Sequence, residues 1–240
     1  MPVMSFSGTA GTEEETSEAI APVNETSTAL AHTTSADTGI QGEISQSDIR
    51  LPRINLVQKM SGTAESFRFG DVLFEKAIKV GDIEHPVAIT VLRLKKQYQE
   101  DLPYGSEDMP RVFDRAEEVK AAGGSLIRGS DHYFSEIAHI QMAIQAPEGL
   151  NEDELEFFPY QFEGVDYAMA VLTVSRSAYS TFAKPIITHG FNTLKDGLAK
   201  GKFELHVDLK KSPKGSYVVP VPVFKGRHTE AAANFFRGLL

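Results

Sequence analysis

The sequence predicts a mainly β fold with few helices, and three observations in the second half of the chain support it. Residues 167–174 form an apolar run rich in strand-favouring side chains, after which 175–198 change to helical spacing. Residues 203–209 then alternate between apolar and polar side chains, as a half-buried strand does. Turn-forming residues at 210–215 lead into a further extended run at 217–224. A helix between a third and a fourth strand, followed by a closing hairpin, predicts an OB-type barrel.

Length and composition allow one large or two small globular domains, with 240 residues of which 41% are hydrophobic. The chain has no cysteine, which excludes disulfide frameworks, thiolate catalysis and cysteine-bound zinc and fits a reducing compartment. No apolar run approaches the roughly 20 residues that span a bilayer. The first six residues have neither the basic start nor the apolar block of a signal peptide.

Residues 1–47 are predicted to form a disordered acidic tail. Their composition, rich in Ser, Thr, Ala, Gly and Glu, buries too little apolar surface to offset the entropy lost on ordering. Residues 1–45 hold seven acids and no lysine or arginine, so the formal charge of −9 falls to −2 for the remainder, which leaves room for local basic patches. The tail is either a solubilising segment, or an acidic arm that recruits partners or competes with nucleic acid for the protein's own groove.

The predicted domain spans residues 48–224 and opens with three extended segments. Residues 51–58 contain a proline and alternate in polarity, as expected of an edge strand. Residues 71–80 and 86–98 are predicted to pair as a hairpin, because a Gly-Asp pair at 81–82 supplies turn residues between them.

Residues 100–124 are predicted to be a helical insertion between strands. Asp114 begins a capping-box pattern that opens a short helix, and two glycines at 123–124 end it. The helix has few apolar residues to bury and is therefore expected on the surface. Residues 134–146 return to a strand with apolar side chains on one face and polar side chains on the other.

Three further features follow this strand. Residues 157–162 are unusually aromatic. Pro185 lies inside the helical stretch and is expected to kink or split the helix near Lys184, because proline lacks an N–H donor and clashes with the preceding turn. Residues 225–240 form a C-terminal tail or short helix with apolar residues at its end: Phe235, Phe236, Leu239 and Leu240.

Signatures of common enzyme sites are missing from the sequence. It contains no Walker-type phosphate loop, no GxGxxG and no GxSxG elbow. His132, Glu136 and His139 resemble a metal cluster, but their spacing is not that of a zinc-binding helix, and a strand would place Glu136 and His139 on opposite faces. Acid pairs lie in segments that look exposed, without a pocket to shift their pKa values. We therefore expect no enzyme, no cofactor and no metal site.

Basic and aromatic residues give the more coherent pattern. Single-stranded nucleic acid is bound by a positive groove with aromatic rings on which bases stack, each stack worth about 1–3 kcal/mol. The competing interpretation is that lysines protect solvent faces and edge strands while the aromatic rings fill a core. Taken together, the residues favour binding. The expected phosphate contacts are Arg93, Lys95, Lys96, Lys210, Lys211 and Lys214, and the expected stacking residues are Tyr98 and Tyr217.

Three segments also carry a resemblance to a known family. They are LPRINLVQ at 51–58, TVSRSAYSTFAKPI at 173–186 and FELHVDLKKSPKGSYVVPVPVF at 203–224. Together they look like bacteriophage replication and recombination proteins, and more narrowly like the OB-fold single-stranded DNA-binding proteins of tailed phages, over residues 50–224. The resemblance implies a protein in the cytoplasm of an infected bacterium that coats exposed strands through the barrel face. Two features depart from the family: the acidic tail lies at the N-terminus, and tryptophan is absent.

The predicted function is non-catalytic, sequence-tolerant binding of single-stranded nucleic acid in replication or recombination, with DNA favoured over RNA. The alternative is a structural or assembly protein, such as a virion component, whose sheet edges and apolar segment at 230–240 contact other subunits. Residues 1–47 and 230–240 are the candidate contacts for protein partners. A homo-oligomer is compatible with either function, and no membrane partner is expected.

Overall fold

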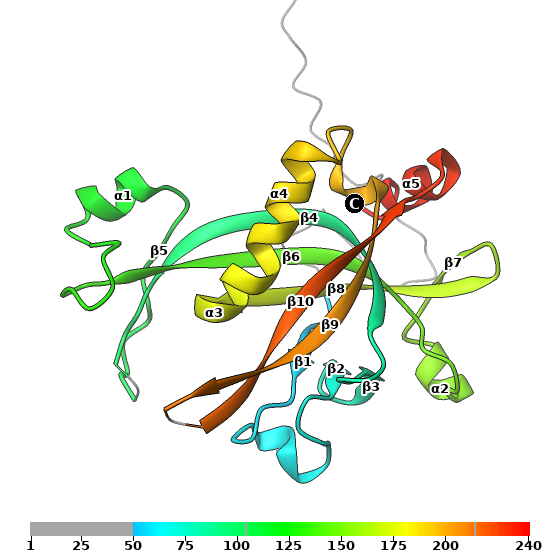
Figure 1. The fold of residues 1–240 in the computed structure, drawn as a ribbon, viewed down its shortest axis with the longest axis horizontal. Helices are drawn as coiled ribbons and strands as arrows, with labels where there is room; N and C mark the ends of the chain where they lie inside the picture. Colours follow the sequence, from blue (N-terminus) through cyan, green and yellow to red (C-terminus); the bar gives the residue numbers. More distant parts are fainter. Residues whose placement is uncertain (1–49, 104, 214) are drawn as a thin grey trace, which may run out of the picture. The chain divides into compact units, whose positions relative to one another are not determined.

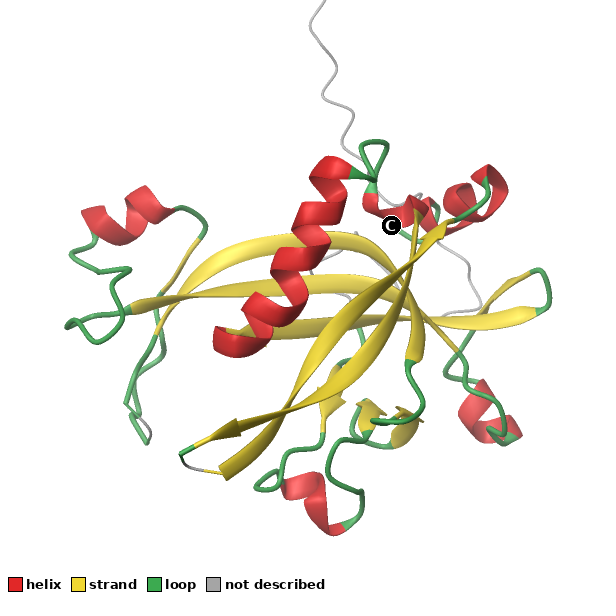
Figure 2. Ribbon diagram, viewed as in Figure 1, coloured by secondary structure: helices red, strands yellow, loops and turns green. Residues whose placement is uncertain are grey.

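Antiparallel strands dominate the computed structural model, which describes residues 50–103, 105–213 and 215–240 (Figure 1). Within this part of the chain the strands form two sheets, and the helices connect strands along the chain or follow the last one (Figure 2). Residues 51–240 make up one unit by their mutual contacts. The predicted disordered tail at 1–47 lies outside the described residues.

The larger sheet is built on a meander of three long strands. β4 (Val87–Glu100) pairs with β6 (Phe134–Gln145), which pairs in turn with β8 (Val165–Ser175). Ala138, Ile140, Met142 and Ile144 of β6 all belong to the main core, as their alternation predicts.

Further strands extend this sheet on both sides. β9 (Gly201–Ser212) pairs with β4 only over Val87–Ile89, and β10 (Gly215–Arg227) pairs with β9 along nearly its whole length. Beyond Ile89 the β9–β10 hairpin leaves the course of β4, which Figure 1 shows as two strands crossing the meander.

Two short strands complete the larger sheet. β7 (Tyr160–Phe162) lies beyond β8, and β5 (Val112–Phe113) pairs with the far end of β4. The mainly β class is thus confirmed, whereas the hydrogen-bonded strands of the described residues do not close into a barrel.

The smaller sheet consists of β1 (Ile54–Leu56), β2 (Val72–Phe74) and β3 (Ile78–Gly81), and the 3-10 helix η2 (Gly62–Glu65) connects its first two strands. The predicted hairpin between 71–80 and 86–98 is wrong, because β3 and β4 belong to different sheets.

A turn inside residues 71–80 causes this difference. Glu75 and Lys76 adopt φ values of 51° and 62°, so the chain folds back between β2 and β3, and these two strands pair with each other. Neither residue is a glycine or an asparagine, the types that usually mark such a left-handed turn in a sequence.

The helical segment between β8 and β9 lies across one face of the meander (Figure 1). It comprises α3 (Arg176–Ala178), a π-helical segment η3 (Tyr179–Ala183) and α4 (Lys184–Asn192). The N–H of Lys184 donates to the carbonyl of Tyr179, five residues back, and α4 starts there with Pro185 in its first turn. The helix that was expected to kink or split near Lys184 changes its hydrogen-bond spacing there but continues without a break from Arg176 to Asn192. Phe182 and Ile186 anchor the segment in the main core.

α5 (Glu230–Arg237) packs on the opposite face of the sheet, so the short helix expected within residues 225–240 is present, whereas residues 225–227 belong to β10. Thr229 caps it through its hydroxyl, which accepts a hydrogen bond from the N–H of Ala232 at 3.3 Å. Phe236 is 1% exposed and packs with Leu92 and Ala143 in a second core, separate from the main one. Phe235 stacks on Phe162 with ring centroids 4.9 Å apart.

The insertion at 100–124 carries the surface helix α1 (Ala116–Ala121). The carboxylate of Glu118 accepts the backbone N–H groups of Asp114 and Arg115 at 3.1 and 3.3 Å, so the capping begins one residue later than predicted. Val119 is the buried residue of this helix. Two more short helices are α2 (Glu152–Leu155) and η4 (Leu198–Lys200). Among the described residues, none of the helices has the length and apolar character needed to cross a membrane.

Candidate nucleic-acid interface

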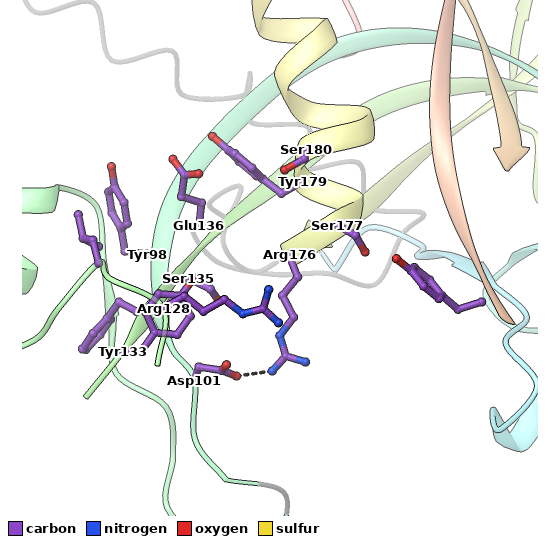
Figure 3. A pocket seen from close by; sticks show the side chains of 13 residues that line it. Tyr98, Asp101, Arg128, Tyr133, Ser135, Glu136, Arg176, Ser177, Tyr179 and Ser180 are labelled. Atoms are coloured by element: carbon purple, nitrogen blue, oxygen red, sulfur yellow. Dashed lines mark hydrogen bonds and ion pairs between the residues drawn. The ribbon is translucent and has the colours of Figure 1, made fainter. Parts of the chain in front are cut away.

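A hollow of about 850 Å³ opens where the far ends of β4 and β6 meet the start of α3 (Figure 3). We call it the tyrosine hollow, because tyrosines reach it from four separate parts of the chain. Its aromatic and cationic lining consists of Tyr98, Tyr133, Phe134, Tyr179, Tyr217, Arg128 and Arg176.

A β-bulge in β4 sets which side chains face this hollow. Val91 pairs with Met142 and Arg93 pairs with Gln141, so Leu92 is the extra residue. After the bulge, Lys96 and Tyr98 lie on the same sheet face as Val91, which is the face covered by the helical segment. The bulge therefore turns the polar end of β4 towards α3.

The tyrosines differ in how much of the ring is available. Tyr179 lines the tyrosine hollow but is only 3% exposed. Tyr98, Tyr133 and Tyr217 are half-buried, which holds each ring in place while leaving part of it open to a ligand. Burial, together with the nearby Glu136 carboxylate, raises the pKa of Tyr179, so its hydroxyl stays neutral.

Lys96 supports the wall of the hollow from β4. Its Nζ lies 2.5 Å from Oε1 of Glu136 and 4.9 Å from the ring centroid of Tyr98. Burial alone would lower the pKa of Lys96, but its hydrogen bonds to Glu136 and Tyr98 raise it above the ordinary value. Lys96 is therefore charged, but its charge is already paired with Glu136, and its contact with the ring helps to orient Tyr98.

Two arginines reach into the tyrosine hollow, as Figure 3 shows. Arg128 makes no hydrogen bond and no ion pair with any part of the chain that the structure describes. Arg176 pairs with Asp101. The backbone of Arg176 adopts φ 52°, a left-handed conformation that costs a non-glycine residue about 1–3 kcal/mol and concentrates at functional sites.

A second hollow of about 310 Å³ adjoins the first, and we call it the loop hollow. Much of its lining comes from residues 99–103, Ser106, Asp108 and Pro110. Asp101, Ser135 and Arg176 line both hollows. The ion pair between Arg176 and Asp101 therefore stands on the boundary between them.

Comparisons with protein-family models, with curated proteins and with solved structures find no match to this chain. Its function is therefore argued from the site. Fold class alone would not assign one, because function depends on the residues that a fold brings together.

The structure brings together three of the residues predicted for binding. Tyr98 and Tyr217 line the same hollow although they are far apart in sequence, and Lys96 contacts Tyr98 beside it. Arg93 and Lys95 lie on the other sheet face, since alternate residues of a strand leave opposite faces. Lys95 there forms an ion pair with Asp114 at 3.1 Å. Arg93 and Lys95, although predicted to contact phosphates together with Lys96, therefore do not share its face of the sheet.

Two of the lysines predicted at the hairpin tip, Lys210 and Lys211, do not line the hollow either. Lys210 pairs directly with Tyr217 and so shares its face of the hairpin, where its Nζ lies 3.6 Å from Asp208. Lys211 pairs with Ser216 and leaves the opposite face. Lys214 lies outside the described residues.

Sequence reasoning missed Arg128, Tyr133, Arg176 and Tyr179. A signal for two of them was present: Arg176 and Tyr179 are three residues apart at the start of a predicted helix and therefore share one side of it. Arg128 belongs to a loop without periodicity, so its position depends on the folded structure.

The suspected metal cluster does not assemble. His132 contacts Glu100 at 3.3 Å, Glu136 binds Lys96, and His139 contacts Thr173 at 3.0 Å. Across the described ranges, no group of three His, Asp or Glu side chains is placed to hold a metal ion.

Proposed function

We propose that this chain binds single-stranded DNA with little sequence preference, in support of phage-type replication or recombination. The observation that carries the proposal is the convergence of three half-buried tyrosines and two arginines on one hollow. Half-buried tyrosine rings keep one part exposed, on which unpaired bases can stack. Because all four bases have a flat aromatic face, this stacking depends little on sequence. The guanidinium groups of Arg128 and Arg176 would bind the phosphates between those bases.

Single strands fit this arrangement better than duplexes, because bases must leave their own stack to reach aromatic side chains. The volume of about 850 Å³ is within the usual range of about 300–1,000 Å³ for ligand sites. Tyr98 and Tyr217 reach the tyrosine hollow from two different strands, so a bound segment would touch both the meander and the β9–β10 hairpin.

The strand order supports an OB-type interpretation of the domain. The strands run β10-β9-β4-β6-β8 with a helix between β8 and β9, which is the order of a five-stranded OB barrel opened between its third and fifth strands. Residues 52–58 occupy that opening: the N–H of Val171 donates to Pro52 O at 2.7 Å, and the Gln58 amide bonds both backbone groups of Val218 at 2.8 and 3.0 Å. We propose an OB-type barrel whose seam these residues fill.

The alternative role in assembly gains less support. Three of the four apolar residues expected to contact other subunits are used within the chain: Phe236 is buried, Phe235 stacks on Phe162, and Leu239 packs against the second core. The proposed role is non-catalytic and, following the family resemblance, belongs in the bacterial cytoplasm with DNA preferred over RNA.

Titration of a fluorescently labelled oligothymidine at several salt concentrations tests the proposal. Anisotropy should rise on binding, and the dissociation constant should increase with salt. Each phosphate of a single strand that the protein neutralises contributes about −0.7 to the slope of the logarithm of the association constant against the logarithm of the salt concentration. A blunt duplex of the same length should bind more weakly. The absence of binding at low salt, or equal binding of single strand and duplex, contradicts the proposal.

A further inference from the structure

The side chains of the loop at residues 125–131 lie on two sides of it. Leu126 and Arg128 line the tyrosine hollow, whereas Ile127 between them does not and is 75% exposed. Its exposure and its absence from the lining place the Ile127 side chain outside the hollow. The loop thus separates the hollow from an apolar side chain held on its outer surface.

Hydrogen bonds fix the shape of this loop. Ser125 exchanges backbone hydrogen bonds with the end of the loop, donating to His132 O at 3.0 Å and accepting from the Phe134 N–H at 2.8 Å. The Ile127 N–H donates to the Ser125 hydroxyl at 3.1 Å, and the Ser130 hydroxyl donates to Ile127 O at 2.6 Å. Ile127 is therefore presented on a preformed tip, which lowers the entropy lost when it contacts a ligand.

A single exposed apolar side chain needs no explanation by itself. Met60, for example, is 97% exposed and lines neither hollow. Ile127 differs because it adjoins Arg128, a cation without a partner among the described residues, and because the same loop leads into Tyr133. The apolar tip is thus continuous with the surface proposed to hold a single strand.

We propose that the loop at residues 125–131 is a separation pin, and that the ligand it fits is the junction between single-stranded and double-stranded DNA. This inference rests on the proposed function. One strand enters the tyrosine hollow, with a phosphate on Arg128 and bases on the tyrosines. Ile127, on the outer side of the loop, then packs against the last base pair of the duplex. It fills the position beyond that pair from which the complementary strand has separated. Isoleucine is one of the apolar residues that insert between base steps and unstack them.

A tailed duplex with 2-aminopurine in its last base pair tests the pin, since the fluorescence of this base rises when it unstacks. The wild-type chain should raise the fluorescence on binding. Ile127→Ser should abolish most of this rise and weaken binding to the tailed duplex by about tenfold, while the affinity for a single strand stays within about twofold, because the wedge contacts only the base pair. Met60→Ser is the matched control, and it should behave as the wild type.

The outcomes separate the inference from the function on which it rests. Binding of the single strand without any fluorescence change on the tailed duplex overturns the pin and leaves the proposed function standing. Equal loss of affinity for both DNAs in Ile127→Ser also overturns the pin, because Ile127 would then be part of the single-strand site. If the wild-type chain binds no single strand, the proposed function and the pin fail together.

Discussion

Arg176 donates a hydrogen bond to Asp101 at the boundary between the tyrosine hollow and the loop hollow. The pair joins the first residue of α3 to the residue that follows β4. Both side chains reach solvent, and exposed ion pairs contribute only about 0–1 kcal/mol to stability. A phosphate can therefore replace Asp101 at little cost, so the pair restrains the site without blocking it.

Asp101→Asn is expected to strengthen binding of single-stranded DNA by about three- to tenfold at low salt, because Arg176 loses a competing anion and the incoming phosphate meets less repulsion. Fluorescence anisotropy measures the change. Asp153→Asn is the matched control, since it removes the same charge from α2, away from both hollows. An equal gain in the control would show that net charge alone is responsible.

Arg176→Gly is expected to separate stability from binding. Glycine accepts the left-handed backbone at φ 52°, so the free energy of unfolding should stay level or rise by up to about 1 kcal/mol. Loss of the guanidinium should weaken DNA binding by about tenfold and reduce the salt slope by about 0.7. Urea unfolding and salt titration give the two quantities.

Arg176→Gln serves as the control, since it removes the charge and keeps the strained backbone. It should reproduce the loss of affinity without any gain in stability. A glycine variant that binds DNA as tightly as the wild type would remove Arg176 from the site.

Much of the fold is readable from the sequence because packing enforces local periodicity. The alternation in β6 and β9 and the apolar end of α5 each correspond to one buried face. The turn at Glu75 and Lys76 was not predictable, since ordinary residues there adopt a conformation typical of glycine.

The candidate site was only partly predictable for a related reason. Alternation alone separates Lys95 from Lys96, but which face meets α3 depends on the bulge at Leu92, and that irregularity has no sequence period. Arg128 reaches the tyrosine hollow through a loop whose course is fixed by hydrogen bonds to Ser125. The positions of Lys96 and Arg128 relative to α3 therefore depend on contacts between segments far apart in sequence, which a sequence pattern does not contain.

Tyr98→Ala and Tyr217→Ala should each weaken binding of single-stranded DNA by about 1–3 kcal/mol, because each removes a ring on which a base stacks. Tyr160→Ala is the matched control, since Tyr160 is 36% exposed on β7 and does not line the tyrosine hollow. Anisotropy titration of the three variants, with circular dichroism to verify folding, measures the effect. Equal losses in all three would contradict a stacking role for the hollow.

His228 is expected to make the docking of α5 sensitive to acid. Its Nε2 lies 2.7 Å from the Thr90 hydroxyl and its ring packs 4.8 Å from that of Phe236, and burial together with the nearby Lys202 lowers its pKa to about 4. The unfolded chain, with an ordinary histidine pKa near 6.5, therefore binds more protons between these values. The stabilisation is complete above pH 6.5 and is lost as the pH falls towards 4.

This loss should amount to about 1–2 kcal/mol, allowing for the solvent that reaches the ring. Urea unfolding at pH 7 and at pH 4.5 measures it in the wild type and in His228→Gln, which keeps a polar group near Thr90 but does not titrate. The variant should lose less stability on acidification than the wild type. If His228→Gln and the wild type lose stability equally, protonation of His228 is not what loosens α5, and the acid sensitivity belongs to other groups.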